Sequence, residues 1–176
     1  MTRKNVLILL NFQWNYFSSN GSAYLGPKAK DLKIRIVEFV NTLDRRAWSV
    51  VQSKDIRSPE DDFYAHQKTQ CTVGSKDIIM LDGITFPGIL VVPATRPSAV
   101  YKTQLLNEIK KHNPEEIAII GTETHAAVLF TASDLKLAGY KVTVVEPLTM
   151  SRDDYLHNSA ISVLSDTVGV KISDRL

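Results

Sequence analysis

The sequence has very little cysteine and no long hydrophobic run. Its 176 residues include one cysteine, Cys71. An intrachain disulfide framework is therefore excluded, and a reducing compartment is favoured. No stretch approaches the roughly 20 apolar residues of a membrane-spanning helix. The apolar run Val6–Leu10 is too short for the hydrophobic region of a signal peptide. We therefore expect a cytoplasmic protein that does not associate with membranes.

The chain also lacks a strong excess of charge of either sign. The formal net charge is +2, and the lysines and arginines are scattered, so no nucleic-acid partner is predicted. The densest basic cluster, Lys110–His112, ends a predicted helix, where it complements the helix dipole. A composition of 44% hydrophobic and 23% charged residues is typical of globular chains. We place a single domain over residues 1–176.

Short runs rich in Val and Ile alternate with helical patterns along the whole chain. Within these runs, apolar and polar residues do not alternate, which is typical of strands covered on both faces. Strands and helices that alternate with short connections predict an α/β fold, here a three-layer domain with a six-stranded, mainly parallel sheet. The predicted strands are Val6–Leu10, Trp48–Ser53, Ile89–Val92, Ile117–Ile120, Lys141–Val145 and Val170–Ile172.

Four helices are predicted between these strands. The third, THAAVLFTASDLKLAGYK, stops at Gly139. The fourth, SRDDYLHNSAISVLSDTVG, takes Ser151 as its N-cap and stops at Gly169. The loop from Lys54 to Asp77 is long for a compact domain, and such loops are often functional. The first two helices show apolar residues at helical spacing: Leu32, Ile36, Phe39, Val40 and Leu43, then Leu105, Leu106 and Ile109.

Three predicted strand ends carry candidate functional residues. Asn11 follows the first strand, Ala94 follows the third, and the turn GTETHAA, residues Gly121–Ala127, follows the fourth. The carboxyl ends of parallel strands meet at one edge of a sheet, where α/β proteins bind their ligands. We therefore expect the functional site at this edge.

Five segments resemble motifs of the isochorismatase-like hydrolases, the superfamily that includes isochorismatases, nicotinamidases and related amidohydrolases. The order and spacing of the motifs match from residue 6 to about residue 172. The resemblance implies the strand order 3-2-1-4-5-6 and a cis peptide bond between Thr122 and Glu123. The segments are VLILLNFQWNYF, SKDIRSPEDDF, TQCTVGS, ATRPSAVYKTQL and GTETHAAVLFTASDLKLAGYKVTVVEP.

The resemblance assigns the family's three catalytic positions to residues that lack the required chemistry. In the cysteine hydrolases an Asp takes a proton from a Cys thiol, the thiolate attacks an amide carbonyl, and a Lys stabilises the developing charge. The Asp, Lys and Cys positions fall on Asn11, Ala94 and Ala127. An amide does not accept a proton near neutral pH, and a methyl group neither attacks nor carries charge. We therefore predict that the triad is lost.

One branch of the superfamily dispenses with the cysteine. Isochorismatases tolerate a small residue there, because cleavage of a vinyl ether needs a proton donor and not a nucleophile. The segments THAA and EPLTMSRDDYLHNSAI resemble this branch, which keeps the Asp and the Lys. The resemblance therefore accounts for Ala127 but leaves Asn11 and Ala94 unexplained.

The metal site described for nicotinamidases also lacks its ligands here. That site needs an Asp and two His on the loop after the second strand. Asp55 remains, but Arg57 and either Asp61 or Asp62 stand at the histidine positions. A guanidinium is not a practical ligand for a divalent ion. We predict no metal and no other cofactor.

Other residues near the expected site have two interpretations each. His125 is an acid or base, or it hydrogen-bonds a turn at a helix start, which is the commoner arrangement. Glu123 belongs to the pocket, or it is a solvated first-turn residue. Arg96 binds an anion, or it pairs with Asp55 or Glu123. Cys71 is most simply a buried structural thiol. The complete candidate pocket is Asn11, Gln13, Trp14, Tyr16, Arg96, Thr122, Glu123 and His125.

Three functions are compatible with these residues. The leading hypothesis is a protein without hydrolase activity that binds a small planar or anionic ligand or acts as an oligomeric interaction partner. The first alternative is a hydrolase or isochorismatase-type enzyme for a small amide or enol ether, with a site rebuilt from His125, Glu123 or Arg96. The second is a structural subunit of a hetero-oligomer.

A homo-oligomer, most simply a dimer, is expected on two grounds. The superfamily mostly assembles, and the loops hold more aromatic residues than a small monomer needs to expose. Trp14 and Tyr16, taken as loop residues, line a pocket for a planar ligand or belong to this interface. The loop aromatics are Trp14, Tyr16, Phe17, Tyr24, Phe63, Tyr64 and Phe86.

Overall fold

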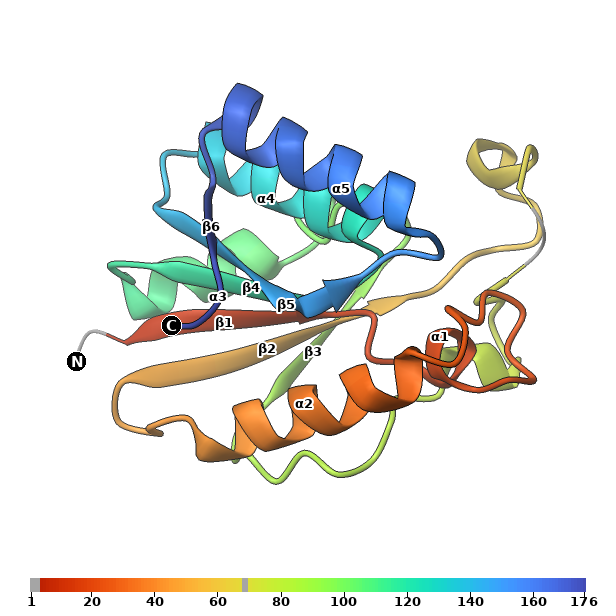
Figure 1. Ribbon diagram of the computed structural model, residues 1–176, viewed down its shortest axis with the longest axis horizontal. Coiled ribbons are helices and arrows are strands. Elements are labelled where there is room, and N and C mark those ends of the chain that lie inside the picture. Colours follow the sequence, from red (N-terminus) through yellow and green to blue (C-terminus); the bar gives the residue numbers. More distant parts are fainter. Residues whose placement is uncertain (1–3, 68–69) are drawn as a thin grey trace.

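Six parallel strands form one sheet in the order β3-β2-β1-β4-β5-β6. The computed structural model describes residues 4–67 and 70–176, and Figure 1 shows helices on both faces of this sheet. The predicted α/β class, strand number and strand order are all confirmed. The strands are β1 (Asn5–Leu10), β2 (Trp48–Asp55), β3 (Leu90–Ala94), β4 (Ile117–Thr122), β5 (Val142–Met150) and β6 (Lys171–Ser173).

The helices form the two outer layers. Helix α2 covers one face of the sheet, and α3 and α4 pack on the other. All four predicted helices are present, and Gly139 and Gly169 follow their helical segments with positive φ as expected. The helices are α1 (Trp14–Phe17), α2 (Ala29–Thr42), α3 (Leu105–His112), α4 (Leu129–Leu137) and α5 (Asp154–Ser162). Shorter turns are η1 (Asp62–Tyr64), η2 (Lys76–Ile78), η3 (Thr124–Val128) and η4 (Val163–Val168).

Strand β1 lies at the centre of the sheet, between β2 and β4. Alternate residues of a strand point to opposite faces, and both faces are covered here, so all of Val6–Leu10 is fully buried. Leu10 is paired with Ser53 of β2 and with Gly121 of β4. The residues that follow these three positions therefore lie side by side at one edge of the sheet.

Two local predictions were wrong. The segment after β1 is not a loop, because Trp14–Phe17 forms the short helix α1 with Asn15 and Tyr16 buried. The N-cap of α5 is not Ser151 but Asp153, whose carboxylate accepts a hydrogen bond from the Leu156 amide at 2.8 Å. Ser and Asp side chains cap helices through the same kind of hydrogen bond, so Asp153 takes the role predicted for Ser151. The Ser151 hydroxyl instead bonds His125.

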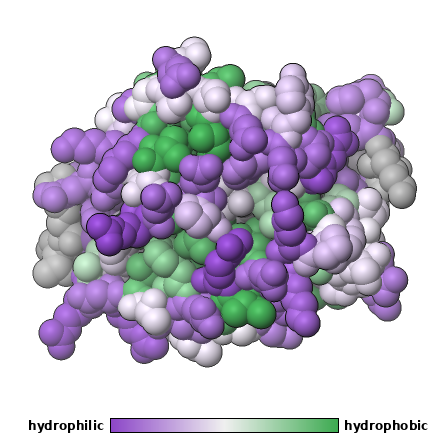
Figure 2. All heavy atoms as spheres, viewed as in Figure 1, coloured by the Kyte–Doolittle hydropathy of each residue, from purple (hydrophilic) through white to green (hydrophobic). Residues whose placement is uncertain are grey.

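The loop aromatics are less exposed than the sequence suggested. Tyr16, Tyr64 and Phe86 are buried, and Phe63 is the exposed one of the seven, at 47%. Figure 2 shows hydrophobic residues in several separate areas between hydrophilic side chains. One ground for a homo-oligomer is therefore weaker, and the homo-oligomer stays a prediction. None of the helices in the described part of the chain has the length and apolar character needed to cross a bilayer.

Gly121 permits the close approach of β4 to β1 at the edge where the site lies. Its φ is +114°, and a Cβ added there would lie 2.2 Å from the Leu10 carbonyl oxygen. Gly139 also has a positive φ, +90°, but a Cβ there would meet nothing within 4 Å. The two glycines therefore separate the effect of steric contact from the effect of backbone conformation.

We expect Gly121→Ala to lower the free energy of unfolding by several kcal/mol, because a backbone contact this short forces the strands apart. The control Gly139→Ala has only the conformational penalty, about 1–2 kcal/mol. Urea denaturation of both variants measures the difference. Equal and small losses in the two variants would contradict the steric argument.

Candidate functional site

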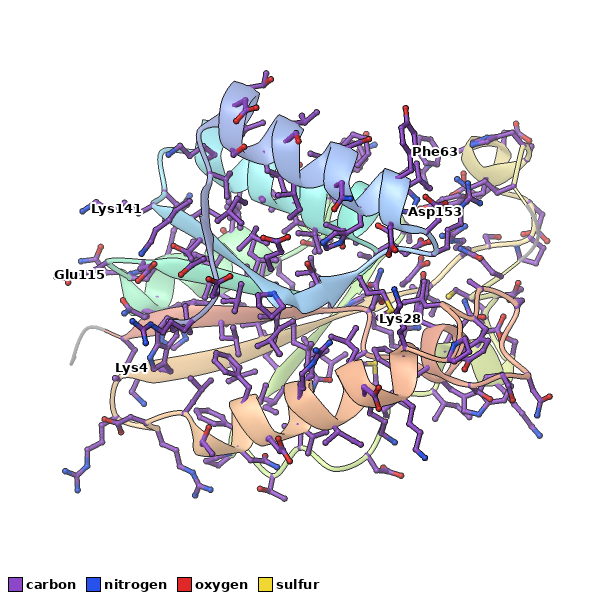
Figure 3. The ribbon with its side chains drawn as sticks, viewed as in Figure 1. Lys4, Lys28, Phe63, Glu115, Lys141 and Asp153 are labelled. Carbon is purple, nitrogen blue, oxygen red and sulfur yellow. The ribbon has the colours of Figure 1, made fainter. Side chains whose placement is uncertain are left out.

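A cavity of about 570 Å³ opens at the carboxyl ends of the strands. Asn11 lines it after β1, Asp55 and Arg57 at the end of β2, Arg96 after β3, and Arg152 after β5. The turn after β4 contributes a further wall with Glu123, His125, Ala126 and Ala127. In Figure 3, Phe63, Asp153 and Lys28 lie at this end of the molecule, and Lys4, Glu115 and Lys141 lie at the opposite end.

Five of the eight candidate pocket residues line this cavity: Asn11, Tyr16, Arg96, Glu123 and His125. The other three do not line it. Gln13 is fully buried, and its amide bonds both the N–H and the carbonyl of Asp55 at 2.6 and 2.9 Å. The Thr122 hydroxyl donates to the Asn11 carbonyl at 3.2 Å, and the Trp14 amide donates to the Ile79 carbonyl. These three residues therefore make contacts within the protein and do not face the cavity.

Arg152 lines the cavity, but sequence reasoning did not identify it. The predicted fifth strand ended at Val145, whereas β5 continues to Met150. Arg152 therefore follows the end of a strand, as the other site residues do. The strand-end rule would have found it if the strand's end had been placed correctly. Of the assigned triad positions, Ala127 lines the cavity, and Ala94 is buried at the end of β3.

Asn11 presents an amide to the cavity from a left-handed backbone conformation with φ +52°. Asn adopts this conformation more readily than most residues. The amide oxygen accepts a hydrogen bond from the Ser53 hydroxyl at 3.1 Å. The amide nitrogen Nδ2 has no acceptor among the described residues. Asn11 therefore offers the cavity a hydrogen-bond donor, where an Asp offers only acceptors.

Asp55 and Arg57 form an ion pair in the cavity wall, with side chains 7% and 10% exposed. Arg57 Nη2 lies 2.9 Å from Asp55 Oδ2, and Nε contacts both carboxylate oxygens at 3.1 and 3.2 Å. The Tyr16 hydroxyl donates to the same Oδ2 at 2.8 Å. Burial lowers the pKa of Arg57, but the Asp55 carboxylate more than offsets this, so the pKa is raised and the guanidinium stays charged.

The Arg57 guanidinium has further partners on the long loop after β2. It stacks on the Tyr64 ring, with its central carbon 3.7 Å from the ring centroid. Nη1 donates to Gln67 Oε1 at 2.9 Å. Gln70, with its amide oxygen turned toward the guanidinium, accepts from Nη2 at 2.8 Å. Tyr64, Gln67 and Gln70 of this loop therefore all contact the buried Arg57 guanidinium.

Arg96 pairs with neither of the expected carboxylates. Its Nη1 lies 2.5 Å from Asp61 Oδ2 and 2.6 Å from the Thr95 carbonyl oxygen. The Phe63 ring centroid lies 4.7 Å from its guanidinium carbon. Asp55 pairs with Arg57, and Asp61, on the long loop after β2, takes the place of both expected partners of Arg96. The expected partner of Arg96 is thereby corrected.

Glu123 is not the solvated first-turn residue that the sequence favoured. It lines the cavity and is largely buried, and its carboxyl has no hydrogen bond or ion pair among the described residues. Burial raises the pKa of Glu123, and Asp55 adds to this, while Arg57 and Arg152 oppose it. A carboxyl of this kind holds its proton to higher pH than an exposed Glu.

His125 hydrogen-bonds a turn, as the commoner interpretation has it, and it also lines the cavity. Its Nδ1 lies 2.9 Å from the Ser151 hydroxyl, which also accepts from the His125 backbone N–H. When the hydroxyl donates to Nδ1, the neutral ring carries its proton on Nε2. Burial and Arg152 lower the pKa of His125, so the ring is neutral at pH 7.

The single thiol lies outside the cavity. Cys71 is fully buried, and its sulfur accepts a hydrogen bond from the Asn15 amide at 3.2 Å. It also contacts the Tyr16 hydroxyl at 3.8 Å. Burial raises the pKa of the Cys71 thiol well above its usual range. The thiol is therefore an inert part of the core.

The sequence matches the isochorismatase domain family over residues 5–174. The chain belongs to the isochorismatase family. The cis peptide bond between Thr122 and Glu123, expected from the motifs, is present. No protein with a curated function matches the sequence.

Three solved structures similar to this isochorismatase-family chain are 15–20% identical to it in sequence. A nicotinamidase/pyrazinamidase from Bacillus subtilis is 20% identical, with a TM-score of 0.86 over 97% of this chain and 99% of that one. An N-carbamoylsarcosine amidase from Thermoplasma acidophilum is 19% identical, with a TM-score of 0.84 over 97% and 95%. A pyrazinamidase from Pyrococcus horikoshii, solved in complex with zinc, is 15% identical, with a TM-score of 0.85 over 98% and 99%. At this identity the likeness shows the shared fold.

The residues of this chain do not fit a zinc ion. Both oxygens of Asp55 are bonded by Arg57, and one also accepts from Tyr16. A metal cation placed at Asp55 would be repelled by the positive charge of the Arg57 guanidinium. Among residues 4–67 and 70–176, no group of three or more His, Cys, Asp or Glu is placed to hold a metal. The absence of a metal stays a prediction.

We expect Arg57→Met to lower the free energy of unfolding by about 3–5 kcal/mol, because it leaves the Asp55 carboxylate buried without its partner. The control Lys28→Met breaks the exposed pair with Asp154 and changes stability by less than about 0.5 kcal/mol. The double variant Asp55→Asn/Arg57→Met recovers part of the loss, since no unpaired charge remains. Chemical denaturation measures all three. A loss no larger than that of Lys28→Met would count against the buried pair.

Proposed function

We propose that this protein binds a small polar molecule in the strand-end cavity and does not hydrolyse amides through a thiol intermediate. One observation carries the proposal. The cavity is open and offers polar groups without protein partners, whereas the only thiol of the chain is buried outside it. Concave sites of several hundred cubic ångströms with a few polar groups are typical ligand sites.

The chemistry of the cavity supports the loss of the cysteine triad. The position that the family motifs assign to the nucleophile is Ala127, whose methyl group lies at the cavity wall. Thiol catalysis needs an exposed sulfur that ionises readily, and Cys71 meets neither condition. At the position assigned to the base, Asn11 supplies a hydrogen-bond donor and no basic oxygen.

The shape of the cavity supports binding over a purely structural role. Tyr16 is packed into the wall through its bond to Asp55, and Trp14 lies outside the cavity, so neither ring fills it. Asn11, Arg96 and His125 all remain at its surface. A subunit with only a structural role has no need for such an open, polar cavity.

A second candidate function rests on Glu123. Burial raises the pKa of its carboxyl, which therefore holds a proton to higher pH than an exposed Glu, as a general acid requires. Hydrolysis of an enol ether begins when an acid protonates the terminal vinyl carbon. Water then adds to the resulting oxocarbenium ion, and the hemiketal breaks down to a carbonyl compound and an alcohol. The acid regains its proton in the process. This reaction needs no nucleophilic residue at position 127.

We expect no turnover of nicotinamide above the buffer rate, because loss of the nucleophile and base of such a unit costs several orders of magnitude. Nicotinamide is the natural first substrate, since one structural neighbour is a nicotinamidase. Chromatographic detection of nicotinic acid measures the rate. Turnover that disappears in Cys71→Ala, with folding retained by circular dichroism, would refute the proposal.

If the second function holds, the protein hydrolyses a small vinyl ether, and Glu123→Gln lowers kcat by about 10²–10⁴-fold, as loss of a general acid does. Aldehyde release from ethyl vinyl ether measures the rate. His125→Gln is the control, since a neutral, Ser151-bonded imidazole is not the proton source in this scheme. Activity that survives in Glu123→Gln and is lost in His125→Gln would assign the acid to the histidine.

A further inference from the structure

The polar groups that the cavity leaves without protein partners are mostly hydrogen-bond donors. Nδ2 of Asn11 and Nε2 of His125 have no partners among the described residues. The Arg152 guanidinium makes one ion pair in this region, a 3.7 Å contact from Nε to Asp153, and its side chain is 70% exposed. An anion is the ligand that accepts from all three groups.

The charge of the wall limits how strongly negative that ligand is. Three arginines and two carboxyl groups are among the described lining residues. Arg57 is neutralised by Asp55, and Arg96 by Asp61. After these pairs are set aside, Arg152 and Glu123 remain, so the cavity suits a singly charged group better than a doubly charged phosphate. A carboxylate is a planar monoanion that an amide and a guanidinium both recognise.

Glu123 is the group that conflicts with such a ligand. Ionised, it places a negative charge beside the anion. Protonated, it becomes one more donor. The charged and titratable groups around it are Tyr16 from α1, Asp55 and Arg57 at the end of β2, Arg152 before α5, and His125 on its own segment. Asp55 and Arg57 compensate each other, and His125 is neutral at pH 7.

We infer that the cavity binds a small monocarboxylate, and that Glu123 takes up one proton from solvent when this anion binds. The inference rests on the proposed binding function and names its ligand class. It also gives Asn11 a role, because an amide donates to the carboxylate at a position where an Asp would repel it. Burial raises the pKa of Glu123, which lowers the free-energy cost of protonating this carboxyl at a given pH.

The test measures binding of acetate, pyruvate and benzoate, with benzamide as the neutral isostere of benzoate and inorganic phosphate as the competing anion. Isothermal titration calorimetry between pH 5 and 8 gives Kd. Repeating it in two buffers with different ionisation enthalpies gives the protons taken up by the unmodified protein. We expect carboxylate binding to weaken about tenfold per pH unit above the pKa of Glu123, with uptake of about one proton per anion.

Three variants separate the contributions. Glu123→Gln keeps a neutral donor, so it binds carboxylates with little change of Kd across this pH range and no proton uptake. Asn11→Asp replaces the donor with a second charge and weakens binding about tenfold or more. His66→Gln and His125→Gln replace the two histidines of the wall and retain the pH slope. Thermal melting checks that each variant folds.

The outcomes distinguish this inference from the binding function itself. Benzamide binding without carboxylate binding overturns the ligand class and leaves the binding function standing. Carboxylate binding without proton uptake overturns the role of Glu123, and a slope that disappears in a histidine variant does the same. Tighter binding of phosphate than of every carboxylate refutes the monoanion. No binding by any probe contradicts the inference and the proposed function together.

Discussion

The buried ion pair between Asp55 and Arg57 is the interaction on which the cavity wall depends. Two charges removed from water are costly unless their geometry is good and their remaining hydrogen-bonding atoms find partners. Here the carboxylate receives Arg57 and Tyr16, and the guanidinium reaches Gln67, Gln70 and the Tyr64 ring. The ion pair thereby connects α1, β2 and the long loop through direct contacts.

The two carboxyl groups that line the cavity have different surroundings. Asp55 bonds Arg57 and Tyr16, whereas Glu123 lines the cavity without a side-chain partner among the described residues. Burial raises the pKa of Glu123, so this carboxyl holds its proton to higher pH than an exposed Glu. The general-acid candidate uses this proton for donation to a substrate, and the inferred anion site uses the carboxyl for proton uptake.

Much of the fold was predictable, because strand and helix patterns are local. The buried strands and the helix stops at Gly139 and Gly169 were read correctly from apolar runs and glycines. Helix α1 was missed, since a single turn is too short to show a period of 3.6 residues. The N-cap of α5 was misplaced because Ser151 and Asp153 have equivalent capping chemistry. Ser151 hydrogen-bonds His125, which is distant in sequence, and Asp153 caps the helix.

By itself the sequence determined the sheet, its order through the family motifs, and the edge at which polar residues gather, because these follow from periodicity and from parallel topology. It also determined that Cys71 is the single thiol of the chain, since composition cannot be changed by folding. Only the tertiary structure decided which polar groups are already partnered. Arg96 pairs with Asp61 and Arg57 with Asp55, and the half-buried carboxyl of Glu123 has no hydrogen bond or ion pair among the described residues. Pairing and burial depend on contacts between distant segments, and no local pattern contains them.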